Sequence, residues 1–239
     1  LAALNANLQI VVAFRMLPKA VWNMPSYGTF NLHASLLPQY RGAAPINWAI
    51  INRELKTGVS TFFIDDKIDT GEIILKEVVI IKERETVGSL HDVLMNTGAH
   101  LVIKTVGLIE RSEESPKKQT ISDVLKNAPK LTKENTKIDW NRPVEEIDSF
   151  IRGLNPYPAA WCTMINNKEE STVKIYNCNY VIEKHTFKNG TIISSKKELK
   201  VLAMNGYLTI HEMQLAGKQK MDIKSFLNGF TFDENSKMM

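Results

Sequence analysis

The sequence predicts an α/β domain followed by a smaller β-rich domain. Runs with strand and helix patterns alternate through residues 1–111, which is typical of a sheet covered by helices on both faces. Residues 112–136 are rich in Lys, Glu, Ser and Pro, which indicates a linker with at most short helices. Short β-rich runs fill residues 137–239 and favour a small barrel. We therefore expect domains at 1–111 and 137–239, joined by the linker at 112–136.

The first domain is expected to alternate strands with helices. Leu8–Phe14 is a continuous apolar run rich in β-branched residues, as in a buried strand. Further strands are predicted at residues 29–35, 59–64 and 73–81. Helical spacing covers residues 43–53, where Pro45 is tolerated in the first turn. It also covers residues 86–111, although Gly98 and Gly107 weaken the prediction of one continuous helix.

The second domain is expected to open with a helix at residues 144–154. Strands are then predicted at residues 161–165, 173–182, 198–204 and 207–215. Gly190 and the pair Asn205-Gly206 mark turns between them. A closing helix is predicted at residues 222–230.

Composition excludes several classes of protein. The net charge of +4 is mild and is spread along the chain, which excludes a dedicated nucleic-acid binder while leaving room for a modest basic surface. Cys162 and Cys178 are too few for a disulfide scaffold and lack metal-ligand spacing, so we expect reduced thiols. No apolar run is long enough to span a bilayer, and the opening run lacks the flanks of a signal peptide. A soluble cytoplasmic protein is expected.

Asn31 and His33 lie at the end of the second predicted strand. Residues i and i+2 of a strand point to the same face, and ligands of α/β sheets bind at strand ends. A carboxamide can hydrogen-bond a carbonyl oxygen that gains negative charge, and an imidazole can move a proton near neutral pH. Asp69, which follows later, could hold the imidazole or a water in place. A satisfied core histidine and an Asx turn at Asp69 explain the same residues equally well.

The next residues, Ser35-Leu36-Leu37-Pro38, also allow two interpretations. They form either a turn that closes the strand, with Pro38 blocking further pairing, or a backbone-lined wall for a flat, partly apolar ligand.

Three longer motifs carry a family resemblance. The sequence Asn-Leu-His-Ala-Ser-Leu-Leu-Pro-Gln-Tyr-Arg-Gly-Ala-Ala-Pro-Ile at 31–46 resembles the signature of the 10-formyltetrahydrofolate-dependent formyltransferases. Asp-Asp-Lys-Ile-Asp-Thr-Gly at 65–71 resembles their second motif. Residues 138–140 and 151–161 are similar to those of the family members that act on methionyl-tRNA. The likeness runs from Val11 to the last residues and is strongest between Pro18 and Gly71.

The resemblance implies roles for particular residues. It implies a partial Rossmann-like formyltransferase domain followed by an OB-like barrel, with Asn31, His33 and Asp69 as the catalytic residues. The folate-contacting residues of the family fall on Ser35, Leu36, Leu37 and Pro38. Arg15-Met16-Leu17 resembles the segment lining the pteridine pocket, and the loop 63–67 is expected to close over it.

The reaction implied by the resemblance is formyl transfer from 10-formyltetrahydrofolate to the α-amine of initiator methionyl-tRNA, in translation initiation. Asn31 and His33 would stabilise the oxyanion, and His33 would manage proton transfer at the leaving nitrogen. Asp69 would orient His33 or a water and help to place the amine. The folate is a co-substrate, and we expect no metal, no membrane partner and a monomer.

The second domain is expected to bind tRNA without sequence specificity, through phosphate contacts that make binding salt-dependent. A solvated lysine-rich surface is an equally good interpretation for any single lysine. The candidate contacts are Lys168, Lys174, Lys184, Lys188, Lys196 and Lys197.

The start of the sequence departs from the family pattern. Family members begin with a first strand, a glycine-containing turn and a loop that helps to hold the tRNA acceptor end, whereas this sequence opens at Leu1 without them. We therefore expect a fragment lacking the first half of the catalytic domain, whose activity stays open. Val11 and Val12 are expected to be exposed.

Two alternatives remain from the sequence. A sugar-nucleotide or glycinamide-ribotide formyltransferase would share the catalytic trio and the folate wall. The β-rich domain and the Asn-Pro-Tyr-Pro stretch at 155–158 argue against the ribotide enzyme and, less firmly, against the sugar enzyme. The other alternative is a catalytically inactive RNA-binding remnant.

Overall fold

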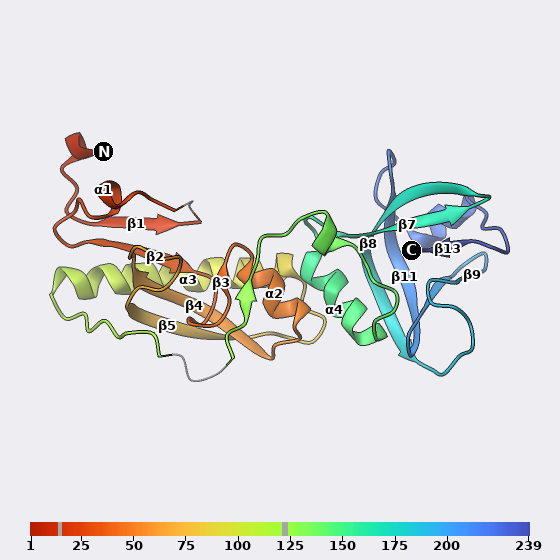
Figure 1. The fold of residues 1–239 in the computed structure, drawn as a ribbon, viewed down its shortest axis with the longest axis horizontal. Coiled ribbons are helices and arrows are strands. Elements are labelled where there is room, and N and C mark those ends of the chain that lie inside the picture. The colour runs from red at the N-terminus through yellow and green to blue at the C-terminus, as the bar shows by residue number, and fades with distance from the viewer. Residues whose placement is uncertain (14–15, 121–123) are drawn as a thin grey trace. The chain divides into compact units, whose positions relative to one another are not determined.

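The computed structural model describes residues 1–13, 16–120 and 124–239, which form two compact units (Figure 1). Unit 1 comprises residues 1–49, 54–83 and 89–130, and unit 2 comprises residues 50–53, 84–88 and 131–239. The segment expected to be a linker therefore contributes to both. Its first part carries β6 (Asn127–Ala128), which pairs in parallel with β3 (Arg41–Gly42) inside unit 1.

Unit 1 is built on a sheet with strand order β1-β2-β4-β5. The strands are β1 (Gln9–Val12), β2 (Thr29–His33), β4 (Lys56–Phe63) and β5 (Ile73–Ile80). β1 and β2 run parallel, whereas β2–β4 and β4–β5 are antiparallel. All four strands were predicted within a few residues, but their mixed direction was not, because side-chain alternation carries no information on the partner's direction.

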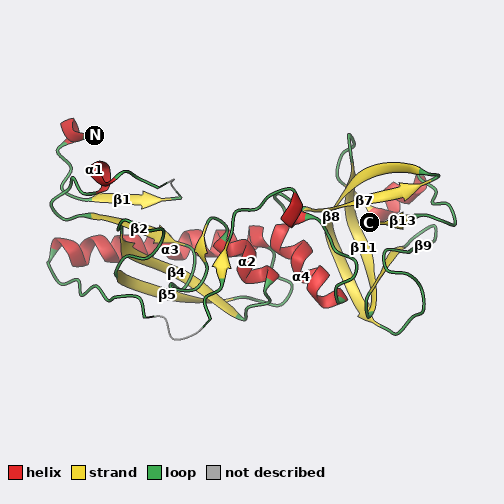
Figure 2. Ribbon diagram, in the orientation of Figure 1, coloured by secondary structure: helices red, strands yellow, loops and turns green. Residues whose placement is uncertain are grey.

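Unit 1 contains the short 3-10 helix η1 (Ala2–Leu4), α1 (Lys19–Trp22), and most of α2 (Pro45–Ile51) and α3 (Val87–Glu110). α3 is one helix that includes both Gly98 and Gly107, and Figure 2 shows how the helices and strands are distributed along the chain. Ile109 of α3 packs with Phe30 of β2 and Ile74 of β5 in a buried cluster. The structure shows why a small residue suits position 98. A Cβ there would come within 2.7 Å of Leu32 Cδ2. Gly98 thus leaves room for the Leu32 side chain of β2 against α3.

β1 lies at an edge of this sheet. The predicted exposure is confirmed for Val12, which is 57% exposed, whereas Val11 is half-buried.

Unit 2 opens with the short 3-10 helix η2 (Glu134–Thr136) and α4 (Val144–Leu154), followed by a seven-stranded sheet and α5 (Ile223–Asn228). The strand order is β13-β7-β8-β11-β10-β9, with β12 paired to β11. The strands are β7 (Ala160–Asn166), β8 (Glu169–Ile182), β9 (Ile192–Ser194), β10 (Leu199–Ala203), β11 (Gly206–Leu215), β12 (Met221–Asp222) and β13 (Lys237–Met238).

The sheet of unit 2 closes on itself. Thr191, just before β9, bridges Lys237 of β13 at the other end of the strand order. The Met238 N–H donates to the Gly190 carbonyl over 2.8 Å. Gly190 is required at this seam, because it has φ +81° and a Cβ would lie 2.1 Å from the Met238 carbonyl oxygen. The predicted barrel is confirmed.

Candidate active site

The side chains of β2 alternate between the hydrophobic core and the candidate site. Phe30 is fully buried in the cluster with α3, and Leu32 meets Gly98 of the same helix. Asn31 and His33 therefore point to the opposite face of the strand. This is the geometry predicted from the i, i+2 spacing.

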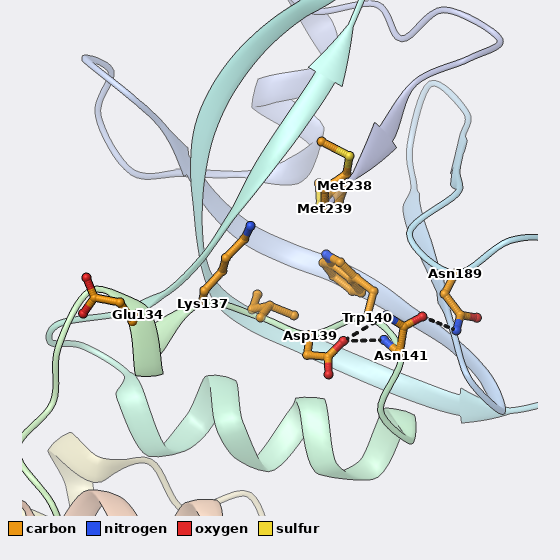
Figure 3. A pocket seen from close by; sticks show the side chains of 9 residues that line it. Glu134, Lys137, Asp139, Trp140, Asn141, Asn189, Met238 and Met239 are labelled. Carbon is orange, nitrogen blue, oxygen red and sulfur yellow. Dashed lines mark hydrogen bonds between the residues drawn. The ribbon is translucent and has the colours of Figure 1, made fainter.

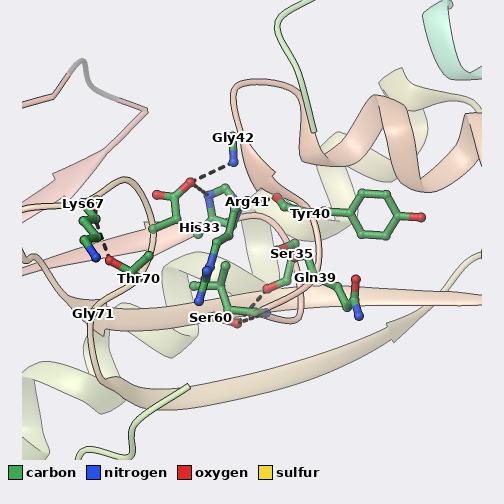
Figure 4. A network of polar contacts seen from close by, with 12 residues as sticks. His33, Ser35, Gln39, Tyr40, Arg41, Gly42, Ser60, Lys67, Thr70 and Gly71 are labelled. Atoms are coloured by element: carbon green, nitrogen blue, oxygen red, sulfur yellow. Dashed lines mark hydrogen bonds and ion pairs between the residues drawn. The ribbon is translucent and has the colours of Figure 1, made fainter. Parts of the chain in front are cut away.

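His33 is 7% exposed and held by the backbone that follows it. Its Nε2 lies 2.8 Å from the carbonyl oxygen of Tyr40 (Figure 4). A carbonyl oxygen only accepts, so Nε2 carries the proton and donates. Nδ1 is then the nitrogen that can take up or release a proton during a reaction.

Asp69 faces that nitrogen. Its Oδ2 accepts a hydrogen bond from the Gly42 N–H at 2.9 Å and lies 3.8 Å from His33 Nδ1. The distance between Asp69 Oδ2 and His33 Nδ1 is too long for a hydrogen bond. It is short enough for an ion pair when both imidazole nitrogens carry a proton. The Asp69 side chain is only 12% exposed, so water screens this pair little.

The turn that carries Asp69 is tightly constrained. Asp69 has φ 54°, a left-handed conformation that few side chains adopt. A Cβ on Gly71 would lie 1.7 Å from the Phe63 carbonyl oxygen, so only glycine fits there. The Thr70 hydroxyl donates to the Asp65 carboxylate over 2.7 Å. These contacts account for the Asp-Thr-Gly sequence that the motif contains.

Asn31 completes the predicted trio. Its Oδ1 is buried and has no hydrogen-bond partner among the residues that the structure describes. A buried amide oxygen without a partner costs free energy, about 1–3 kcal/mol. An unsatisfied acceptor of this kind beside His33 fits a site that binds a ligand carrying a hydrogen-bond donor, and an amine is such a ligand.

The turn at residues 35–38 has two buried side chains and two that are partly exposed. Ser35 and Leu37 are buried; the Ser35 hydroxyl donates to the Gln39 carbonyl over 2.7 Å, and the Leu37 side chain packs with Phe62 and Ile73. Leu36 and Pro38 stay partly exposed. The surface that this turn offers to a ligand is therefore its backbone together with Leu36 and Pro38.

Two side chains from neighbouring strands fix the turn. The Ser60 hydroxyl donates to the Ser35 carbonyl over 2.7 Å and accepts from the Leu37 N–H over 3.2 Å. The Lys76 ammonium donates to the Leu37 carbonyl, and burial lowers the pKa of Lys76. Sequence reasoning missed both residues, which lie inside strands and match no motif.

The two segments expected to enclose the pteridine meet in unit 1. Met16, Leu17, Asp65 and Asp66 line a common pocket of about 320 Å³, together with Trp22 of α1. Cofactor-sized pockets begin at about 300 Å³. Arg15, named with this segment, lies outside the described residues.

The six candidate lysines lie in unit 2. Five of them are exposed: Lys168, Lys184, Lys188, Lys196 and Lys197. Lys174 is half-buried, and its ammonium donates to the Pro158 carbonyl over 3.2 Å. Lys174 is therefore the weakest candidate for a phosphate contact.

Unit 2 also has a pocket of about 500 Å³, which no sequence motif predicted (Figure 3). Lys137, Trp140, Asn141 and Asn189 are among its lining residues. Nearby, the thiol of Cys162 is fully buried, and burial raises the pKa of Cys162 to about 12. The thiol is therefore protonated, and it is not part of a disulfide, as expected from the sequence.

Within the described parts of the chain, no three His, Cys, Asp or Glu residues gather as metal ligands would. Nor is any described helix long and apolar enough to cross a membrane.

Comparison with known proteins assigns both units. Residues 1–106 match the family described as formyl transferase, and residues 130–231 match the formyl transferase C-terminal domain. The chain is 55% identical to a methionyl-tRNA formyltransferase of Flavobacterium johnsoniae, covering all of this chain and 76% of that protein. It is 50% identical to a methionyl-tRNA formyltransferase of Parabacteroides distasonis, over 96% of this chain and 73% of that protein.

Solved structures share the fold at lower identity. HypX from Aquifex aeolicus in complex with tetrahydrofolic acid has a TM-score of 0.67 and 19% identity, over 95% of this chain and 40% of that one. The sugar 3N-formyl transferase WlaRD has a TM-score of 0.62 and 22% identity, over 88% and 73%. The predicted fold class, a Rossmann-like formyl transferase domain followed by a β-barrel, is confirmed. Because its curated relatives are about half identical along its whole length, the chain belongs to the methionyl-tRNA formyltransferases, within the formyl transferase family.

Proposed function

We propose that this protein transfers the formyl group of 10-formyltetrahydrofolate to the α-amine of methionyl initiator tRNA. The observation that carries the proposal is the approach of Asp69 Oδ2 to Nδ1 of His33. His33 lies on the same strand as Asn31, whose buried Oδ1 has no hydrogen-bond partner among the described residues. This site stands in a chain 55% identical to a methionyl-tRNA formyltransferase.

His33 handles the proton in this mechanism. The amine attacks the formyl carbon and forms a new N–C bond, and Nδ1 accepts the proton that the amine must lose. The same nitrogen then delivers the proton to N10 of the folate as the C–N10 bond breaks. The ring can do this without rotating, since Nε2 stays bound to the Tyr40 carbonyl.

Asp69 stabilises the imidazolium formed in between, across the 3.8 Å that separate its Oδ2 from Nδ1. The Gly42 N–H holds that oxygen in place. Asn31 supplies the amide for the formyl oxygen as negative charge develops on it, and a donor in this role contributes about 2.7–4 kcal/mol.

The folate lies against the Ser35–Pro38 turn in this proposal, with the pterin directed toward the pocket of Met16, Leu17 and Asp65. The aminoacyl end of the tRNA meets the formyl group at Asn31 and His33. Exposed lysines of unit 2 contact tRNA phosphates. We propose a cytoplasmic monomer, because the substrates and the trio within one unit call for no second copy.

A competition among amine acceptors tests the proposal. Purified protein is given 10-formyltetrahydrofolate with methionyl initiator tRNA, a 3-amino or 4-amino sugar nucleotide, or glycinamide ribotide. Formylation of methionyl-tRNA alone is expected. Transfer to an amino sugar or to the ribotide would replace the proposal with one of those activities. Retarded migration of tRNA without any formyl transfer would identify an inactive RNA-binding protein.

A further inference from the structure

Gln119 joins the two motifs of the active site through a single side chain. Its Nε2 donates to the Asp69 carbonyl and to the Gly71 carbonyl, each over 2.9 Å. Its Oε1 accepts from Arg41 Nε at 3.2 Å and from Arg41 Nη2 at 2.6 Å. Two donor hydrogens and two acceptor lone pairs are the full capacity of a carboxamide. Each of them is used here.

The backbone around Gln119 is itself fixed. Two residues earlier, Lys117 exchanges a pair of backbone hydrogen bonds with Ile73 at the start of β5, at 2.8 and 2.9 Å. Gln119 is thereby carried on a short segment tied to the same sheet that holds β2. A bound segment can act as a fixed support, which a free linker could not.

Asp69 depends on this support. Its left-handed backbone is unfavourable for a residue with a side chain, by roughly 1–3 kcal/mol, and persists only where its surroundings enforce it. The two carbonyls that Gln119 holds flank the Asp69–Gly71 turn on either side of Thr70. Rotation of that turn would displace the Asp69 carboxylate from Gly42 and from His33.

We propose that Gln119, clamped by Arg41, is a positioning residue that sets the Asp69 carboxylate opposite His33 Nδ1. This inference rests on the proposed formyl transfer for its kinetic consequence. Its structural content is independent of it, because the position of Asp69 can be measured without turnover.

Gln119→Glu distinguishes positioning of the turn from mere anchoring of Arg41. The glutamate keeps an acceptor for Arg41 and adds opposite charge, yet it offers no N–H to the two carbonyls. If Gln119 served only to hold Arg41, this variant would behave as wild type. A positioning role requires it to lose turnover as Gln119→Ala does.

The kinetic expectation is a fall in kcat of about 10²-fold in both variants, which is the scale for a displacement near 1 Å in an active site. The KM for the folate should change by less than about threefold, since the Ser35–Pro38 wall is held separately by Ser60 and Lys76. Tetrahydrofolate binding, measured by calorimetry, verifies that each variant is folded. Unchanged kcat in Gln119→Glu would overturn the inference.

Gln214→Ala is the matched control. Gln214 accepts from the Tyr176 hydroxyl at 2.8 Å and donates to the Lys218 carbonyl at 2.8 Å, so it bridges two groups as Gln119 does, within unit 2. Its loss should leave kcat within about twofold of wild type.

Crystal structures of wild type and of Gln119→Ala decide the structural claim. We expect the Asp69 carboxylate to leave the Gly42 N–H in the variant. An Asp69 that remains 3.8 Å from His33 Nδ1 overturns the inference even if the wild type proves to formylate a different amine. Failure of the wild type to formylate methionyl-tRNA, with Asp69 displaced in the variant, overturns the proposed reaction and leaves the positioning role supported.

Discussion

At the scale of single residues, Asn31 is expected to lower the stability of the protein while raising its activity. Replacing it with Ala removes an amide whose Oδ1 is buried without a partner among the described residues. We expect kcat to fall by about 10²–10³-fold, because a transition-state donor is lost. The melting temperature should stay the same or rise, since the cost of the unsatisfied amide disappears.

Asn179→Ala is the control for Asn31→Ala, because Asn179 is an exposed asparagine of β8. Asn179→Ala should alter neither kcat nor the melting temperature. Thermal melts and steady-state formyl transfer measure both variants. A parallel loss of activity and stability in Asn31→Ala would show that the amide is a structural group.

His33→Gln separates the two nitrogens of the imidazole. A glutamine amide can still donate to the Tyr40 carbonyl, the contact that Nε2 makes at 2.8 Å, but it cannot accept a proton at the position of Nδ1. Turnover should therefore drop by about 10²–10⁴-fold, the range for general acid–base catalysis. Stability should fall less than in His33→Ala, which loses the Tyr40 contact as well. Equal melting temperatures for the two variants would argue against the assigned tautomer.

The sequence predicted the reactive side chains but not the groups that hold them. Alternation along one strand was enough to place Asn31 and His33 on a common face. The Tyr40 carbonyl and the Gly42 N–H are backbone groups that every residue possesses, so no sequence pattern marks them. Gln119 lies 50 residues beyond Asp69, in a segment whose composition indicated a linker. Only the fold brings it to the site.

At the scale of secondary-structure elements, the close packing of β4 against β5 depends on Gly58. A Cβ at this position would lie 2.0 Å from the Glu77 carbonyl oxygen and 2.6 Å from Leu36 Cδ2. Gly58→Ala should therefore lower the free energy of unfolding by about 1–3 kcal/mol, the cost of overpacking. Because Leu36 belongs to the proposed folate wall, tetrahydrofolate binding should weaken too.

Gly229→Ala provides the comparison, since a Cβ there meets nothing within 4 Å. It should leave the free energy of unfolding within about 0.5 kcal/mol of wild type. Urea denaturation and calorimetry measure both effects. A Gly58→Ala protein as stable as wild type would mean that β4 and β5 can move apart without cost.

Elements with a long periodic pattern were the ones that the sequence could predict. α4 occupies the predicted residues 144–154, β11 matches its predicted range within one residue, and β8 contains its predicted range but begins earlier, at Glu169. α1, β3, β6, β9, β12 and β13 were missed, and each has two to four residues. Segments this short have no period to detect. β3, β6 and β13 are paired with strands distant in sequence, β3 with β6 and β13 with β7.

At the scale of the whole molecule, the mild net charge of +4 raises the question of how a large polyanion is held. The exposed lysines 184, 188 and 196 follow β8 and β9 in sequence, and all three belong to unit 2. If these three lysines contact phosphates, the affinity for tRNA depends on where they lie in unit 2. If only the overall field matters, any three positive charges of the chain serve equally.

Two triple variants with the same net charge decide between local contact and overall field. Lys184, Lys188 and Lys196 are changed to Gln in one, and Lys56, Lys104 and Arg111 of unit 1 in the other. Each neutralised phosphate contributes about 0.7–0.9 to the slope of log K against log salt. We expect the unit 2 triple to flatten that slope for tRNA by about 2 or more, and the unit 1 triple to leave it nearly unchanged. Equal slopes for both triples would refute phosphate contacts by these lysines, because only the shared net charge would then govern binding.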